Sequence, residues 1–109
     1  MDHRFHLAST PFRLIESGEK VVELRLNDAK RQTVNVGDTI LFVGPRLQEI
    51  KVRVAELLVA ATFRDLLGLA DPRDAGYPCS QDALAALRSF YTPEQEREYS
   101  ALGIRFELL

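Results

Sequence analysis

The sequence predicts a β-rich α+β domain in which a small closed sheet carries short helices on its outside. Three observations favour this class. Short segments rich in β-branched and apolar residues, separated by turn residues, fill most of residues 3–58. Helix-start signals dominate residues 62–95. Residues 103–108 then return to strict apolar–polar alternation, so we expect the last strand to rejoin the sheet.

Length and composition describe one domain spanning residues 1–109, since 46% hydrophobic residues can supply a single core. No apolar run approaches the roughly 20 residues of a membrane-spanning helix, and the N-terminus lacks the apolar segment of a signal peptide. We therefore expect a cytoplasmic protein with no membrane partner. Cys79 is the only cysteine, expected as a buried or half-buried loop thiol, and no metal or cofactor is expected.

The first half of the chain is expected to hold most of the sheet. The expected strands cover residues 3–7, 21–26, 32–36, 39–43 and 50–58. Thr10 and Pro11 predict a helix start with Thr10 as its cap, and Gly18 is expected to end that helix in a left-handed conformation. Gly37 supplies a turn, where the Asp38 side chain can accept backbone N–H bonds.

The second half is expected to be mainly helical before its final strand. Thr62 is expected to cap a helix over residues 63–67, and Ser80 a helix over residues 81–90. Thr92 and Gln95 have the spacing of a capping box. Residues 68–80, with two glycines and two prolines, form the least regular loop.

Charge is unevenly distributed along the chain. The net charge is −2, which argues against a strong non-specific nucleic-acid binder. Residues 1–55 hold nine Lys or Arg against seven Asp or Glu, whereas residues 56–109 hold five against nine. Any site for an anion is therefore expected in the first half.

The stretch from residue 18 to residue 31 carries the functional signal. It places four cations, Lys20, Arg25, Lys30 and Arg31, around one short apolar strand. Such a cluster can hold a phosphate, a carboxylate or a polar base. Glu23 and Arg25 are two residues apart on a strand, so they share a face and can pair. Strict alternation puts Lys20 on the opposite face, unless the strand begins irregularly at that end.

In these residues the chain resembles the ASCH domain, a member of the PUA-like superfamily. The resemblance covers nearly the whole chain and is carried by Thr10–Phe12, Ile15, Gly18–Asp28, Lys30–Arg31, Val36–Ile40, Phe42, Thr62–Phe63, Leu66–Leu67, Phe90–Glu94 and Leu102–Ile104. It implies a PUA-like pseudo-β-barrel of about six strands with surrounding short helices, and a cleft beside the motif strand. It also implies RNA or a nucleotide-like small molecule as the partner.

The same resemblance implies an alternative, because a small bacterial subgroup looks like amidohydrolases acting on 4-acetylcytidine and some relatives resemble ribonucleases. In that subgroup the lysine at the position of Lys20 is the activating base or the partner of the nucleophile, and the position of Glu23 is a threonine nucleophile. This chain departs there, because a carboxylate does not fill the role of a hydroxyl nucleophile. The third catalytic residue, a glutamate, has no counterpart that we can match in residues 68–80.

Two hypotheses follow for one cleft. In a binding module, Lys20 and Arg25 neutralise a phosphate or a base carbonyl, while Glu23 accepts from a base amine. Lys30 and Arg31 then hold backbone phosphate, or form a solvated pair at a turn tip. In a hydrolase, Lys20 activates water with Glu23 as its partner, which requires surroundings that lower the pKa of a lysine. Three tyrosines, Tyr77, Tyr91 and Tyr99, are candidates for base stacking or for half-buried packing.

Overall fold

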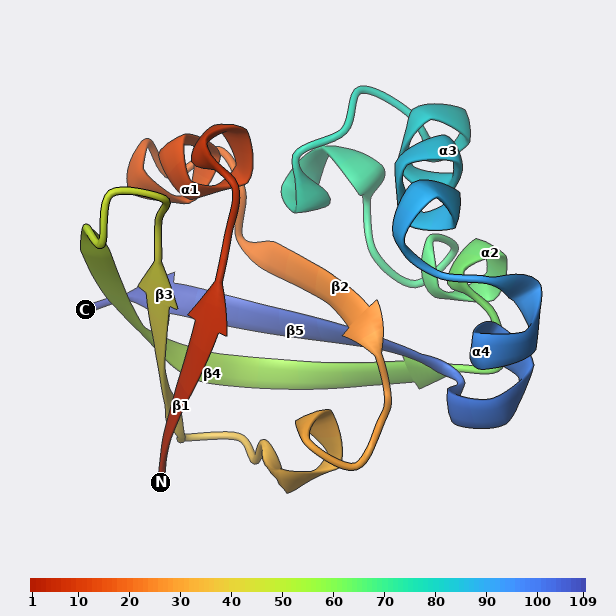
Figure 1. Ribbon diagram of the computed structural model, residues 1–109, viewed down its shortest axis with the longest axis horizontal. Coiled ribbons are helices and arrows are strands. Elements are labelled where there is room, and N and C mark those ends of the chain that lie inside the picture. The colour runs from red at the N-terminus through yellow and green to blue at the C-terminus, as the bar shows by residue number, and fades with distance from the viewer.

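The computed structural model describes residues 1–109 and has one five-stranded sheet, in the order β1-β3-β4-β5-β2 (Figure 1). The strands are β1 (Asp2–His6), β2 (Val22–Leu26), β3 (Thr39–Val43), β4 (Glu49–Ala60) and β5 (Ala101–Leu108). β1 runs parallel to β3, and every other neighbouring pair is antiparallel. A register shift between Val54 and Glu56 interrupts the long β4–β5 pairing. The α+β class expected from the sequence is confirmed.

The sheet curls until its two end strands, β1 and β2, face each other without sharing backbone hydrogen bonds (Figure 1). Side chains close this seam instead. Arg25 Nη2 donates to the His6 carbonyl oxygen at 3.2 Å, and the Arg25 guanidinium lies 5.0 Å from the centre of the Phe5 ring. The pseudo-barrel is therefore completed by a charged residue of β2 resting on β1.

The helices divide into two groups around the sheet. They are α1 (Ser9–Glu16), α2 (Phe63–Leu66), α3 (Ser80–Phe90) and α4 (Pro93–Tyr99), with 3-10 turns η1 (Arg31–Thr33) and η2 (Pro72–Ala75). Figure 1 shows α1 across one end of β1 and β3, whereas α2, α3 and α4 gather beyond β2. No helix is long and apolar enough to cross a membrane.

Two apolar clusters make up the core. β2 lies between the second cluster and the seam. The first lies inside the curled sheet and includes Phe5, Phe42 and Phe106. The second packs the β2 residues Val22, Leu24 and Leu26 against Phe63, Leu66 and Leu87 of the helices. Because side chains alternate along a strand, Glu23 and Arg25 are left facing the seam. The alternation of β2 therefore builds core on one face and the candidate site on the other.

The structure has one strand fewer than the about six expected, because residues 32–36 do not form a strand. The Asp28 side chain accepts the backbone N–H of Arg31 at 3.1 Å, and the Asp28 carbonyl accepts that of Gln32 at 2.9 Å. These bonds wind the chain into η1. An aspartate that satisfies nearby N–H groups competes with strand formation, and the expected strand here was wrong.

Two predicted helix caps were also wrong by one or two residues. α1 begins at Ser9 after Ala8, which has no side-chain capping bond, so Thr10 lies inside the first turn. α3 begins at Ser80 after Cys79, which is exposed rather than buried or half-buried. α1 therefore begins two residues earlier and α3 one residue earlier than the capping pattern indicated, because extended backbone before a helix does not require a side-chain acceptor.

The other local signals are confirmed. Thr62 Oγ1 accepts the Asp65 N–H at 3.1 Å, and Thr92 and Gln95 form the reciprocal capping box of α4. Gly18 and Gly37 adopt the left-handed conformation, with φ of 85° and 91°. Each of these features depends only on residues within four positions, which explains why the sequence pattern was sufficient.

Candidate functional site

Lys20 reaches the seam because β2 begins later than the alternation of the sequence indicated. Gly18 ends the α1 region in a left-handed turn, and the Lys20 N–H then donates to the Leu14 carbonyl at 3.0 Å. β2 starts only at Val22, so Lys20 precedes the regular strand. Its ammonium lies 2.9 Å from Glu23 Oε1, and only 5% of the residue is exposed.

Glu23 is the centre of a buried chain of three charges. Its Oε1 accepts from Lys20, while its Oε2 lies 2.9 Å from both Nε and Nη2 of Arg25. Glu23 is 4% exposed. The antiparallel register with β5 places Glu23 opposite Ile104 and Arg25 opposite Leu102, so apolar neighbours exclude water from one side of the chain.

Burial and pairing act against each other on this carboxyl group. Burial disfavours the charged form and would raise the pKa of Glu23, but the nearby charges of Lys20 and Arg25 and their hydrogen bonds outweigh that effect. The pKa of Glu23 is therefore lowered, and the group is a carboxylate at neutral pH. The three side chains together carry one net positive charge.

The charge chain forms part of the wall of a cavity of about 290 Å³. The cavity is lined by His6, Leu7, Ala8, Pro11, Lys20, Glu23, Leu24, Arg25, Tyr77, Leu87, Phe90 and Tyr91. These residues come from β1, α1, β2, the loop after η2 and the end of α3. Its volume is at the lower end of the roughly 300–1,000 Å³ typical of small-molecule pockets.

Three aromatic residues give the cavity planar walls. Phe90 is 73% exposed although it is a large apolar side chain. Tyr91 is stacked on Phe63 with ring centres 5.6 Å apart, which fixes the plane of its ring. Burial raises the pKa of Tyr77, with a further contribution from the Glu23 charge, and burial also raises the pKa of Tyr91. Both phenols therefore remain protonated at neutral pH.

The irregular loop of residues 68–80 supplies a wall that rests on Lys20. The Val21 N–H donates to the Asp74 carbonyl at 2.7 Å, which ties η2 to the residue after Lys20. Gly76 follows with φ of 92°. A Cβ atom there would lie 3.1 Å from Leu14 Cδ1 and 3.5 Å from Lys20 Cδ. A glycine at this position thus lets the loop backbone approach the lysine stem.

The remaining two predicted cations lie differently. Arg31 is ion-paired with Asp28 at 3.2 Å, and its guanidinium lies 5.2 Å from the centre of the same Phe5 ring that Arg25 contacts. Its Nε is buried and has no hydrogen-bond partner. Lys30 is exposed at the start of η1. The structure therefore brings Lys20, Glu23 and Arg25 together, places Arg31 beside them, and leaves Lys30 on the surface.

Sequence reasoning missed two aromatic contributors. The guanidinium groups of Arg25 and Arg31 both lie over the ring of Phe5, which belongs to β1. No local sequence pattern links residue 5 with residues 25 and 31. Phe90 was not singled out, although an apolar residue at the end of a helix just before Tyr91 is a weak signal for an exposed aromatic wall. Tyr99, a stacking candidate, packs against the helical cluster instead.

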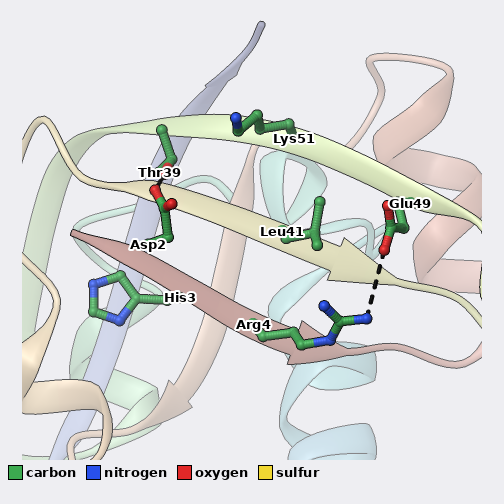
Figure 2. Close-up of a pocket in the computed structure, with 7 residues that line it drawn as sticks. All are labelled: Asp2, His3, Arg4, Thr39, Leu41, Glu49 and Lys51. Carbon is green, nitrogen blue, oxygen red and sulfur yellow. Dashed lines mark hydrogen bonds and ion pairs between the residues drawn. The ribbon is translucent and has the colours of Figure 1, made fainter.

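A second and larger hollow, of about 590 Å³, lies on the outer face of β1, β3 and β4 (Figure 2). Figure 2 shows Arg4 reaching Glu49, a pair 3.5 Å apart whose side chains are 58% and 49% exposed. Asp2 is hydrogen-bonded to Thr39, and Leu41 is the one apolar residue of the lining. The lining holds two acidic and two basic side chains, whose charges cancel: Asp2, Glu49, Arg4 and Lys51. We therefore assign the candidate site to the smaller, aromatic cavity.

His3 and Asp38 form a separate contact under the turn at Gly37. His3 Nε2 lies 2.8 Å from Asp38 Oδ2, and the same oxygen accepts the Asn35 N–H at 2.9 Å. The hydrogen bond with His3 is the largest of the effects that lower the pKa of Asp38 to about 2. Asp38 thus accepts the backbone bond expected of it, and it anchors a turn away from the seam.

The comparisons with known proteins agree with the fold described above. The profile of the ASCH domain matches residues 6–109. The crystal structure of hypothetical protein PH0355 has a TM-score of 0.90 and 29% identity, with all of both chains covered. The solution structure of protein PF0455 from Pyrococcus furiosus has a TM-score of 0.79 and 31% identity, covering 100% of this chain and 98% of that one.

A more distant structure shares the fold alone. The crystal structure of ASCH from Zymomonas mobilis has a TM-score of 0.61 and 17% identity, and the match covers 95% of this chain and 65% of that chain. No curated protein matches the sequence. The profile match over nearly the whole chain, together with the PUA-like half-barrel, leads to one conclusion: the protein belongs to the ASCH domain family.

Proposed function

We propose that this chain is a binding module for RNA or a nucleotide-like ligand, held at the seam between β1 and β2. The observation that carries the proposal is the convergence of Lys20, Glu23 and Arg25 on one cavity with aromatic walls. Aromatic planes stack on bases, and cations neutralise phosphate or bind base oxygens. The net positive charge of this chain of side chains suits a ligand of the opposite sign.

The site divides into an inner and an outer part. Lys20 and Arg25 border the cavity, where a base can enter between Phe90 and the tyrosines. Lys30 and Arg31 lie at the start of η1 and bind phosphates of the RNA backbone. Arg31 supports this role because its guanidinium lies over the same Phe5 ring as that of Arg25, which places its charge beside the seam.

The alternative is a hydrolase that acts in the same cleft on 4-acetylcytidine or on an RNA phosphodiester, with Lys20 and Glu23 as the catalytic pair. The geometry supports this function less well. Both Glu23 oxygens already accept from cations, and a carboxylate with a lowered pKa is a weak general base. We expect cytidine release from 4-acetylcytidine to be absent. Robust turnover that Glu23→Gln abolishes would assign the chain to the enzyme class instead.

The binding proposal is tested by titrating a short single-stranded RNA at several salt concentrations, followed by fluorescence anisotropy. A log–log slope of about −3 would mean that all four cations contact phosphate, at near 0.7 for each contact, whereas a slope of about −1.4 is expected if only Lys30 and Arg31 do so and Lys20 and Arg25 meet the base. Lys30→Gln should reduce that slope by about 0.7 without changing stability, because Lys30 is exposed. Lys51→Gln is the matched control, since Lys51 is an exposed lysine of the outer hollow.

These measurements separate three outcomes. A slope that only Lys30→Gln reduces supports the proposed surface. Equal effects of Lys30→Gln and Lys51→Gln would mean that RNA is attracted by general charge and not by the seam. No binding at low salt would remove the RNA proposal.

A further inference from the structure

The polar groups that face the cavity are mainly hydrogen-bond donors with capacity to spare. The Lys20 ammonium has three N–H donors, and Glu23 Oε1 is its one ion-pair partner in the protein. Arg25 uses Nε and Nη2 on Glu23 and on the His6 carbonyl. Its Nη1 has no protein acceptor, and it is not among the buried orphan atoms, so it is available to a ligand.

The two acceptors that lie against Lys20 and Arg25 are already engaged by these cations. Glu23 is the only carboxylate of the lining, and each of its oxygens accepts from a cation. The His6 carbonyl accepts from Arg25. The hydroxyls of Tyr77 and Tyr91 and the His6 imidazole can each donate or accept, so the imbalance rests on Lys20 and Arg25, which can only donate.

The shape of the cavity indicates a base and not a bare anion. Seven of its 12 lining residues are hydrophobic, and Phe90, Tyr77 and Tyr91 present aromatic rings. A naked phosphate would lose water against such walls without gaining partners there. A base has apolar faces that stack and a polar edge that can meet Lys20 and Arg25.

Resting on the proposed function, we propose that this cleft selects keto bases over amino bases. The selected bases, uracil and guanine, carry an oxo group where cytosine and adenine carry an exocyclic amine. An oxo oxygen accepts from the free N–H groups of Lys20 or Arg25. An amine in its place would set donor against donor and leave N–H groups of the buried Lys20 without an acceptor, which lowers the affinity for an amino base.

The test uses two matched pairs of mononucleotides, UMP with CMP and GMP with AMP, titrated into the full chain and followed by NMR. Within a pair the phosphate and the ring size are the same, so the ratio of dissociation constants reports the exchange of the keto edge (the oxo group and the adjacent ring N–H) for the amino edge. UMP with CMP is the cleaner pair, because guanine also carries a C2 amine that adenine lacks. We expect the keto member of each pair to bind about tenfold more tightly. Inorganic phosphate, titrated separately, reports how much of the binding belongs to the anion.

Two variants connect the preference to the site. Lys20→Met keeps an apolar stem and removes the donors, so the UMP:CMP ratio should fall towards one. Lys51→Met, on the outer hollow, should leave the ratio unchanged. Should Lys20→Met not fold, the ratios of the wild-type chain test the proposal without it.

Each result has one interpretation. Equal affinities within both pairs, or tighter binding of CMP and AMP, would overturn the keto preference while RNA binding in the salt titration still supported the module. Binding of inorganic phosphate as tight as that of UMP would show that the cavity takes the anion and would overturn the base assignment. No binding of any mononucleotide would also overturn it, and absence of RNA binding as well would remove the proposed function.

Discussion

The seam cavity and the outer hollow of β1, β3 and β4 contain similar charged residues, but they differ in burial. In the seam, Lys20 and Glu23 are about 5% and 4% exposed and lie 2.9 Å apart. In the hollow, Arg4 and Glu49 are more than half and nearly half exposed and lie 3.5 Å apart. Water therefore screens the Arg4–Glu49 pair. The buried Lys20 and Glu23 are screened much less, so each charge depends on its partners in the protein.

The residues that line the two regions also differ in how apolar they are. The seam cavity has three aromatic residues in its lining, whereas the larger hollow has one apolar residue in its lining. By volume alone the hollow would rank above the seam cavity. Buried charges whose bonding capacity exceeds their protein partners, next to planar apolar walls, are therefore the better guide to a binding site.

The largest expected difference between the regions is the effect of removing one carboxylate from each. Glu23→Gln should lower the free energy of unfolding by about 3 kcal/mol, because two buried cations lose their partner. Glu49→Gln should change it by about 0.5 kcal/mol or less, because the Arg4 pair is exposed. Urea unfolding of both variants measures the two values. Similar losses in the two variants would mean that burial does not distinguish the regions.

A smaller effect is expected from matched glycine substitutions. Gly76 and Gly37 have nearly equal φ values, 92° and 91°, but only Gly76 would place a Cβ near other atoms. Gly37→Ala should cost about 1 kcal/mol for the left-handed backbone, and Gly76→Ala about 2 kcal/mol because the Leu14 side chain must also give way. Thermal melts measure the costs.

RNA affinity adds a second measurement to that pair. Gly76→Ala should weaken binding because the loop would move away from the Lys20 stem, whereas Gly37→Ala should not. Unchanged affinity in Gly76→Ala would show that the loop does not set the position of Lys20.

The smallest expected effect is a difference in acid stability. The folded-state pKa of Glu23 is lowered from 4.5, so its contribution is complete above about pH 4.5 and is lost as the pH falls through the folded pKa. Glu23→Gln should lack this part of the acid limb, while Glu49→Gln should retain it because Glu23 is intact.

Unfolding free energies from neutral pH to about pH 3 provide the measurement. Asp38, whose pKa is lowered to about 2, should leave all variants with a further loss at still lower pH. An acid limb in Glu23→Gln as steep as that of the wild type would contradict the coupling of Glu23 to Lys20 and Arg25.

Much of the fold could be predicted from the sequence because its signals are local. β3 was expected over the residues that it occupies, and the capping box of α4 and the left-handed glycines were expected from neighbouring residue types. The strand expected over residues 32–36 does not form, and the cause is again local. There the Asp28 side chain and backbone satisfied nearby N–H groups and formed η1.

The sequence by itself determined which charged residues were available and that Glu23 and Arg25 share a face of β2, because strand alternation is a property of the backbone. Only the tertiary structure decided that Lys20 joins them, that Arg25 reaches Phe5 and His6 on β1, and that Phe90 stands at the mouth. These contacts join residues far apart in the chain across a seam without backbone pairing. They depend on how far the sheet curls and where the loop of residues 68–80 rests, which no local pattern encodes.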